Sequence, residues 1–467
     1  MRPISVFFNA AFLLVVLTGC KDNYSSSIAI PPTSTNSPIA ATPTIGTSAP
    51  APTSGTTRTP TPTGAPKPAP APAPAAKPAP PPTPAPTPPS APQAPRNSAN
   101  ISVQVKGNHL VDTSGKTLQL RGVNVSGLES IAAQGWSAND PWGGWKPVWS
   151  ALASWKVNAI RLPMNEASWL GYHCTDATGS NRNPDPGANY QATVINTVKE
   201  ATAAGIYVIL DLHWSAPATF CPLNQNPAPD TDNSITFWQS VSNTFKANPA
   251  VMFELFNEPY LSASANSDGV LDSDIDSAAC LVSGCKASYY FAGNVGSSAT
   301  SKISKNWMTA GLQTLIDTVR ATGAKNVVLV GALHYSNDLT VWTNPNPPHD
   351  ALGQLAAAWH LYSSSYPYNN PKSTATQQIA DTVAARMPLL ITEIGDIVGA
   401  GAIPTFTQAV LPWADKNGYS YLGWTWNNWN FSSNVLVKDS SGTPTPGFGS
   451  YFKQHLICVQ SGASNCQ

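Results

Sequence analysis

The sequence predicts an α/β fold, a (β/α)8 TIM barrel with a short N-terminal β-hairpin. After residue 100, short apolar runs alternate eight times with helical segments, and several of these runs end in polar or acidic residues. The globular part, 100–467, is long for one ordinary domain but within the range of such a barrel. A doubly wound open sheet is the alternative, but no glycine-rich phosphate loop supports it.

The elements follow in order along the chain. The stretch 101–120 alternates and contains turn residues, so it predicts the hairpin. Strands are expected at 118–124, 157–163, 206–213, 251–258, 326–332, 355–362, 388–394 and 421–427. Helices are expected at 145–155, 189–204, 234–247, 302–322, 374–386, 405–417 and 448–456. The interval 333–354 is the weakest part of the pattern, because no good helix separates the fifth and sixth strands there.

Charge and composition narrow the class of ligand. The 25 basic residues balance the 25 acidic ones, and no basic face is evident, so no nucleic-acid partner is expected. Charged residues are sparse while tryptophan is plentiful, a composition that suits a polar but uncharged ligand. Trp136, Trp142, Trp145, Trp169, Trp214 and Trp342 fall in or near predicted βα loops, where about half should line binding subsites and the rest pack.

The first 20 residues have the pattern of an export signal. Arg2 precedes the apolar stretch Val6–Leu17, which is too short for a transmembrane helix. The following Leu-Thr-Gly-Cys resembles the lipobox of bacterial lipoproteins, which makes 1–20 a lipoprotein signal peptide and Cys20 the lipidated first residue of the mature chain. The alternative is an ordinary secretory signal with an incidental cysteine. Contact with a membrane is expected only through this lipid anchor.

Residues 21–99 are rich in proline, alanine and threonine and are expected to form a disordered linker. The densest part, 60–96, cannot build a core and favours extended polyproline II. A stalk between the anchor and the catalytic domain, 100–467, is the preferred interpretation. Recognition of a partner through the proline motifs is the alternative.

The cysteines fit an oxidising compartment. There are seven, and lipidation of Cys20 leaves an even set of six, which in an exported protein indicates disulfides. Proximity favours two pairs, Cys280 with Cys285 and Cys458 with Cys466, and leaves Cys174 and Cys221 to join two loops. A zinc site is the rival, but the spacings lack the usual paired pattern, so no metal is expected.

The segment VMFELFNEPY, 251–260, carries two glutamates on one predicted strand. Glu254 and Glu258 share parity and hence a face of the strand. Glu258 is expected at the tip, where a barrel places its active site, and Glu254 one layer down, paired with an arginine such as Arg121 or Arg161. Asn257 points the other way unless the strand end twists.

Other predicted strands also end in groups that can do chemistry. These are Arg161, Asp211, His213, His360, Tyr362, Glu393 and the tryptophans Trp424, Trp426 and Trp429. Two glutamates facing each other across a barrel mouth are what glycosidic hydrolysis needs, one as acid and one as carboxylate. A separation of about 5 Å would give retention of configuration. Arg161 beside Glu393 would keep that group ionised, and an apolar, aromatic-walled site would keep Glu258 protonated.

Over residues 100–456 the sequence resembles glycoside hydrolase family 5 of clan A, the endoglucanase type. The resemblance is carried by Asn257-Glu258-Pro259, by LLITEIG around Glu393 and by LRGVNVSGLE at 120–129. It implies that Glu258 is the acid/base, Glu393 the nucleophile, and Asn257 a ligand of the sugar 2-hydroxyl. The remaining substrate-binding set that it implies is Arg161, His213, His360, Tyr362 and Trp426.

One segment departs from the family pattern. Residues 260–300 hold Cys280 and Cys285 and match no standard family loop. Within them Asp272, Asp274 and Asp276 alternate like the start of a calcium loop, but the glycine and closing glutamate are missing, so a solvated acidic turn is expected.

The function expected is hydrolysis of internal β-1,4-glucosidic bonds of cellulose or soluble β-glucan, with retention and without a cofactor. The partner is the polysaccharide, and the protein is expected to be a monomer, exported and either lipid-anchored or secreted. Alternatives are the same chemistry on mannan, xyloglucan or β-1,3-glucan, a surface glycan-binding lipoprotein without catalysis, and a metal-dependent barrel hydrolase. Two glutamates argue against the binder, and the lack of grouped histidines argues against the metal enzyme.

Overall fold

A computed structural model describes residues 101–466, apart from 132–136, 140–145, 173–182, 184, 217–224, 261–273, 293–301, 364–373, 397–400, 428–434 and 464–465. The predicted signal, Cys20 and the linker therefore lie outside the described residues, as do Cys174, Cys221, Asp272 and Trp429. The same holds for Trp136, Trp142 and Trp145. No helix of the described part is both long and apolar enough to cross a membrane.

Eight parallel strands close into a barrel, as predicted. In barrel order they are β3 (Arg121–Asn124), β4 (Ala159–Asn165), β5 (Tyr207–Trp214), β6 (Val251–Glu254), β9 (Val328–Val330), β10 (Leu355–Tyr362), β11 (Leu389–Gly395) and β12 (Ser420–Gly423). The predicted N-terminal hairpin is β1 (Gln104–Lys106) paired with β2 (His109–Val111). The strand prediction is thus confirmed in number and order, and only the fourth, fifth and eighth predicted runs end earlier than expected.

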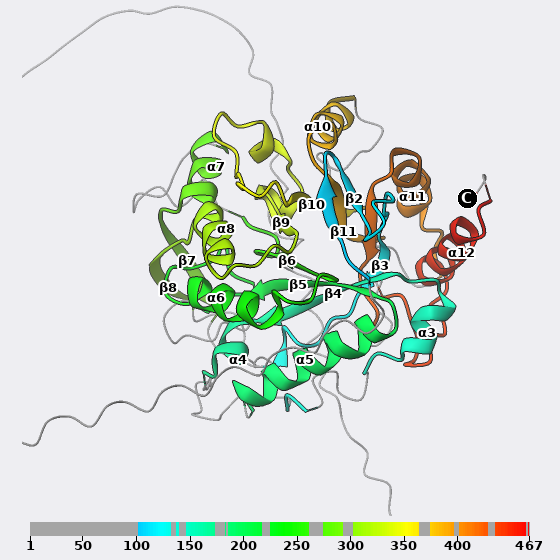
Figure 1. Ribbon diagram of the computed structural model, residues 1–467, viewed down its shortest axis with the longest axis horizontal. Helices are drawn as coiled ribbons and strands as arrows, with labels where there is room; N and C mark the ends of the chain where they lie inside the picture. The colour runs from blue at the N-terminus through cyan, green and yellow to red at the C-terminus, as the bar shows by residue number, and fades with distance from the viewer. Residues whose placement is uncertain are drawn as a thin grey trace, which may run out of the picture. The chain divides into compact units, whose positions relative to one another are not determined.

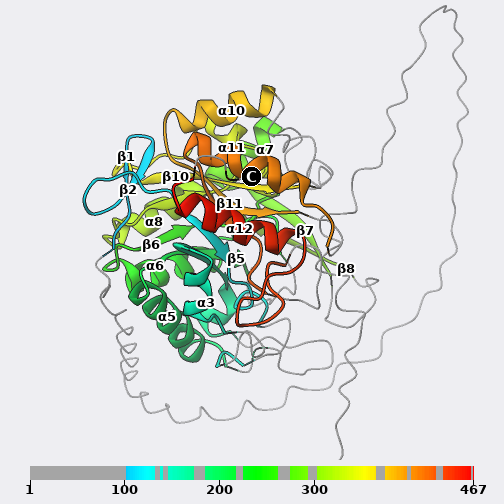
Figure 2. The same ribbon diagram turned by 90° about the vertical axis from the view of Figure 1, so that its right-hand side faces the viewer.

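Helices surround the barrel (Figures 1 and 2). They are α3 (Trp149–Ser154), α4 (Glu166–Leu170), α5 (Ala188–Ala203), α6 (Ser234–Phe245), α8 (Leu312–Ala321), α10 (Thr374–Ala384), α11 (Thr405–Asn417) and α12 (Phe448–Gln460). In α8 the buried residues Leu312, Leu315, Ile316 and Val319 recur with the period of one helix face. The weak interval between the fifth and sixth barrel strands holds only the four-residue turn α9 (Leu333–Ser336) and the 3-10 turn η3 (Thr340–Thr343).

The segment after β6 is an excursion from the barrel. It contains α7 (Asp274–Ser283) and a hairpin of β7 (Lys286–Ala292) with β8 (Lys302–Met308). The helix predicted over 302–322 is therefore wrong over 302–311, because β8 pairs along its whole length with β7 and the helix begins only at Leu312. The predicted disulfide Cys280–Cys285 is confirmed and links the end of α7 to the start of β7.

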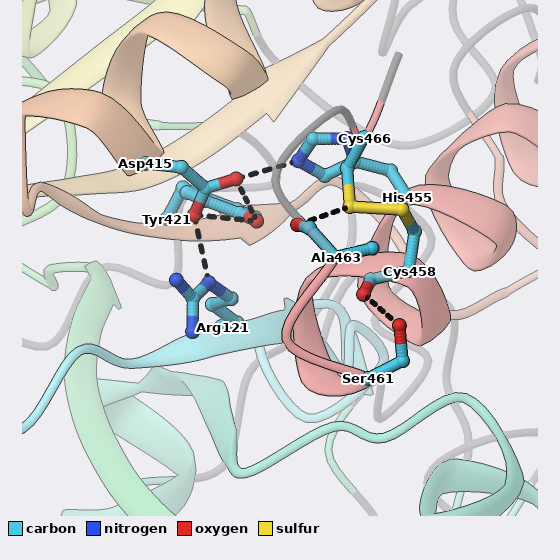
Figure 3. The surroundings of a disulfide bond; sticks show 8 residues. All are labelled: Arg121, Asp415, Tyr421, His455, Cys458, Ser461, Ala463 and Cys466. Carbon is cyan, nitrogen blue, oxygen red and sulfur yellow. Dashed lines mark hydrogen bonds and ion pairs between the residues drawn. A yellow bond between two sulfur atoms is a disulfide. The ribbon is translucent and has the colours of Figure 1, made fainter.

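The second predicted disulfide, Cys458–Cys466, is also confirmed and ties the end of α12 to the C-terminal residues (Figure 3). Beside it, His455 Nε2 lies 2.7 Å from Asp415 Oδ2, and Arg121 Nε lies 2.8 Å from Asp415 Oδ1. Arg121 therefore bonds to Asp415 from α11, and of the two arginines considered as partners of Glu254, only Arg161 contacts it.

Two apolar clusters hold the barrel. One fills its interior below the site and includes Ala159, Ile209, Met252, Leu329 and Leu390. The larger one lies between strands and helices and contains the fully buried Trp155, Trp169, Trp238 and Trp359. Trp169 and Trp342 belong to it, so these two are among the tryptophans that pack. The interior cluster stops at the layer of Arg161, where buried polar side chains take its place.

Candidate active site

Arg161 is the centre of the site. It lies on β4, where its side chain is fully buried. Its guanidinium nitrogens lie 2.8 Å from Glu254 Oε2, 3.0 Å from Asp211 Oδ2, 2.6 Å from Glu393 Oε1, 3.0 Å from Asn124 Oδ1 and 2.9 Å from Asn257 Oδ1. Inward-facing positions of five strands or strand tips therefore meet at one cation. The guanidinium fork suits this role, since it offers five donors in a fixed plane.

Burial and charge act against each other in this cluster. Burial alone would raise the pKa of Glu254, but Arg161 and His360 outweigh it and lower that pKa to about 2. For Asp211 the effect of burial is larger than that of Arg161, so its pKa is raised well above the usual range. Burial also opposes the charge of Arg161, yet Asp211, Glu254 and Glu393 raise its pKa above the usual value. Arg161 and His360 therefore favour the ionised form of Glu254, whereas burial disfavours the ionised form of Asp211.

His360 lies between the two predicted catalytic glutamates. Its Nδ1 is 2.9 Å from Glu258 Oε1 and 3.5 Å from Glu393 Oε2. A register shift between β10 and β11 sets His360 opposite Glu393. Burial would lower the pKa of His360, but Glu393, followed by hydrogen bonds with Glu254 and Glu258, raises it to about 10. The imidazole is thus protonated at neutral pH, and its Nδ1–H donates to Glu258 Oε1.

Tyr362 fixes the other side of Glu393. Its hydroxyl donates to Glu393 Oε2 at 2.5 Å, while Oε1 receives the hydrogen bond of Arg161. Gly395, two residues after Glu393, makes room for this tyrosine, because a Cβ there would lie 2.8 Å from the Tyr362 ring. Both oxygens of Glu393 are therefore held in place from opposite directions.

The carboxyl groups of Glu258 and Glu393 approach closely. One oxygen of each, together with a ring nitrogen of His360, lie within 4.8 Å of one another. This matches the roughly 5 Å separation of retaining glycosidases and is shorter than the roughly 6.5–9.5 Å that inverting enzymes need for a water. Within the described part of the chain, this trio is also the one group of three such side chains that could hold a metal ion. The expectation that no metal is needed stays a prediction.

Glu258 and Asn257 lie beyond the end of β6. Asn257 was expected to face away unless the strand end twists, and its Oδ1 does reach Arg161 Nη2. Glu258 adopts a left-handed φ of 47°, which L-residues rarely do outside sites that depend on it. Gln225 supports this turn, since its Nε2 donates to the carbonyl oxygen of Glu258 at 2.7 Å.

His213 lies at the end of β5 and contacts Asp211 and Trp424. Its Nδ1 is 2.7 Å from Asp211 Oδ2, and its ring stacks on Trp424 with 5.5 Å between centroids and 7° between planes. Burial, followed by the charge of Arg161, lowers the pKa of His213 to about 3. This histidine is therefore neutral, in contrast to His360.

The aromatic residue of the eighth strand that approaches the site is Trp424. Trp426, which the sequence analysis preferred, packs edge-on against Trp155 at 4.9 Å and belongs to the core. A Cβ at Gly442 would contact its ring at 3.1 Å, so Trp426 is enclosed on that side as well. The geometry favours Trp424 for a role at the site. The two residues alternate along the chain, and sequence alone could not say which one faces inward after the strand ends.

Sequence reasoning also missed four polar residues. Asn124 and Thr392 connect the cluster below the glutamates, since Asn124 bonds to Arg161 and Thr392 Oγ1 donates to Glu254 Oε1 at 3.0 Å. Gln225 lies between β5 and α6, outside any strand or helix, so no hydrophobic periodicity in the sequence indicates its position. Glu129 is buried near the site, and burial raises its pKa to about 8. Asn124 and Glu129 lie in the LRGVNVSGLE motif, which could have indicated both.

Comparison with known proteins identifies a family and several relatives. The family model described as cellulase (glycosyl hydrolase family 5) matches residues 111–430. The chain is 24% identical over 345 residues to endoglucanase E-5 of Thermobifida fusca, covering 71% of this chain and 55% of that enzyme. It is 29% identical over 160 residues to the major extracellular endoglucanase of Xanthomonas campestris, covering 33% and 32%. The chain thus spans less than two thirds of the length of either relative.

A solved structure shares the fold. The β-glucanase of Saccharophagus degradans superposes with a TM-score of 0.54 at 22% identity, covering 80% of this chain and 98% of that one.

Proposed function

The chain belongs to glycosyl hydrolase family 5, and from that premise we propose that it is a retaining endo-β-1,4-glucanase. The observation that carries this proposal is the approach of the Glu258 and Glu393 carboxyl oxygens to within 4.8 Å at the mouth of the barrel. Relatives named endoglucanases support β-1,4-glucan as the substrate. The non-catalytic binder has no use for such a pair.

In the first step Glu393 attacks the anomeric carbon while Glu258 donates its proton to the departing glycosidic oxygen. Arg161 and Tyr362 hold the two oxygens of Glu393, so the attacking lone pair is oriented before substrate arrives. The sugar is then an ester of Glu393, and the leaving chain has gained a hydroxyl. In the second step Glu258 takes a proton from water, which attacks the same carbon and releases Glu393.

The remaining residues are proposed to bind the sugar at the reaction centre. Asn257 accepts from Arg161 through Oδ1, so its amide nitrogen is oriented to donate to a sugar hydroxyl. Neutral His213 has its Nδ1 hydrogen-bonded to Asp211, which leaves its Nε2 free to form a hydrogen bond with a sugar hydroxyl. We assign the aromatic platform to Trp424 in place of Trp426, since Trp424 stacks on His213.

Release of reducing sugar from a panel of polysaccharides tests the substrate. We expect mixed-linkage or carboxymethylated β-1,4-glucan to be cleaved at least about tenfold faster than mannan, xyloglucan or β-1,3-glucan, a discrimination of about 1.4 kcal/mol. Viscosity should fall early relative to sugar release, as internal cleavage requires. A preference for mannan would support the retaining mechanism but show that the substrate is not β-1,4-glucan. Inactivity on the whole panel would contradict the proposal.

We propose further that the protein is exported and held at the cell envelope through a lipid on Cys20, with 21–99 as a stalk and 100–467 as the catalytic domain. Support comes from the signal pattern of 1–20 and the two disulfides. The relative from Xanthomonas campestris is named as extracellular. Metabolic labelling with a radioactive fatty acid should mark the wild type and not a Cys20→Ala variant. Equal labelling of both would contradict the anchor.

A further inference from the structure

We propose that Gln225 is a positioning residue for the acid/base Glu258 and holds the backbone turn from which that glutamate projects. This inference rests on the proposed glycosidase function and deepens it. Gln225 lies between β5 and α6 and is half-buried. Its Nε2 donates to two successive carbonyl oxygens, that of Glu258 at 2.7 Å and that of Asn257 at 3.2 Å. Both bonds go to the backbone, so Gln225 acts on the reaction through Glu258.

The two hydrogen bonds select one conformation of Glu258. Successive carbonyl groups of an extended strand point to opposite sides, so a single amide group can bond to both only where the chain turns between them. Glu258 makes this turn with a φ of 47°, in the left-handed region that L-residues disfavour. In the described part of the chain, the other non-glycine residues with a positive φ are Lys156 and three residues of α9. Such a conformation persists only where its surroundings hold it, and Gln225 supplies two of the bonds that do so.

Gln225 can hold this turn because its own segment is anchored. The neighbouring Asn226 is fully buried, and its Nδ2 donates at 2.6 Å to the carbonyl oxygen of Ser215, which follows β5. One residue further along, the carbonyl oxygen of Pro227 accepts from the backbone amide of Tyr260 at 2.8 Å. The segment is therefore fixed on one side to the end of β5 and on the other to the chain beyond the acid/base.

The contacts distinguish the two catalytic glutamates. Both oxygens of Glu393 are bonded by side chains from β4 and β10, and Gln225 lies on neither strand. Glu258 is held through its carboxyl group by His360 Nδ1 at 2.9 Å and through its backbone by Gln225. Loss of the Gln225 amide should therefore misplace the acid/base and leave the nucleophile in position. The resulting defect should appear in the steps that transfer a proton.

The test compares two substrates that differ in their need for an acid. Gln225→Met keeps the length of the side chain and removes both donors. On cellopentaose, whose leaving group must be protonated, we expect kcat/KM to fall about tenfold, a part of the roughly 10²–10⁴-fold that a general acid supplies. A dinitrophenyl β-cellobioside has a leaving group that needs no proton, so its kcat/KM should stay within about twofold of the wild type.

The aryl substrate also reports the second step, in which Glu258 acts as the base. When the base is misplaced, the glycosyl ester of Glu393 accumulates, so kcat and KM should fall together about three- to tenfold while their ratio is kept. Azide needs no base and should restore kcat and give a product of retained configuration. Partial unfolding would lower kcat without lowering KM, and azide would not correct it.

Gln119→Met is the matched control, because Gln119 Nε2 also donates to a backbone carbonyl, that of Tyr419 at 2.7 Å, before β3 at the opposite end of the barrel. It should leave the ratio of the activities on the two substrates unchanged. For Gln225→Met, an unchanged ratio, whether through equal losses or through none, would overturn the positioning role. This ratio does not depend on the folded fraction of the variant. A wild type that cleaves neither substrate would instead remove the glycosidase proposal and this inference with it.

Discussion

Replacing Glu393 by alanine is expected to lower kcat/KM by about 10⁴-fold or more on every glycoside, because no other group can form the covalent intermediate. Replacing Glu258 by alanine should lower turnover of cello-oligosaccharide by about 10²–10⁴-fold, the usual contribution of a general acid. The loss should be much smaller in the glycosylation step of an aryl glycoside with a good leaving group. Steady-state and burst kinetics on both substrates measure the difference.

Rescue by azide assigns the two roles independently. In Glu258→Ala the glycosyl ester of Glu393 still forms, and azide should attack it to give a product of retained configuration. In Glu393→Ala azide takes the place of the nucleophile in a single displacement, so an aryl glycoside should give the inverted product. Glu200→Gln is the control, because Glu200 pairs on the surface with Lys146 and has no part in the site. Opposite stereochemistry would exchange the assignments, and full activity in either variant would discard them.

The barrel could be predicted because each strand is a short apolar run, each run is followed by a helical segment, and the order is sequential. Local hydrophobic periodicity is therefore enough to predict the type and order of most barrel elements. The failure at 302–308 has a physical reason. β8 exists because it pairs with β7, and no sequence window shows that partner. α9 was not predicted for a similar reason, since three left-handed residues are held by contacts with Pro259 and His360 that are distant in the chain.

In the site as well, the residues set by local sequence could be predicted and those set by distant contacts could not. Glu393 and Arg161 could be placed because strand parity determines where their side chains point, and Glu258 because the Asn-Glu-Pro motif marks the end of its apolar run. Asn257 and Trp424 lie just beyond strand ends, where parity no longer applies and the direction depends on tertiary hydrogen bonds. Gln225 belongs to a loop that follows β5, and only its hydrogen bond to the Glu258 carbonyl shows that it supports the site.

Arg161→Met is expected to damage stability and activity together. It removes the only cation that bonds to Asp211, Glu254 and Glu393 among the arginines and lysines of the described residues. Leaving buried carboxylates without their partner costs about 3–5 kcal/mol, which corresponds to a fall in Tm of about 10 °C. Glu393 would also lose the hydrogen bond at Oε1, so kcat should fall even at temperatures where the variant is folded. Calorimetry and kinetics at low temperature separate the two effects.

The destabilisation by Arg161→Met should also depend on pH, with a definite sign. In the wild type the pKa of Glu254 is lowered from 4.5 to about 2, so its contribution to stability is present above about pH 4.5 and is lost as the pH falls towards 2. The difference in Tm between wild type and variant should therefore be largest near neutral pH and shrink in acid. Arg320→Met is the matched control, because Arg320 bonds to Asp350 at 2.9 Å before β10, at the opposite end of the barrel. It should lower Tm without changing kcat of the folded enzyme. A difference in Tm that stays constant from about pH 7 to pH 3, or an Arg161 variant with wild-type kcat, would show that the arginine does not hold Glu254 and Glu393 as the distances indicate.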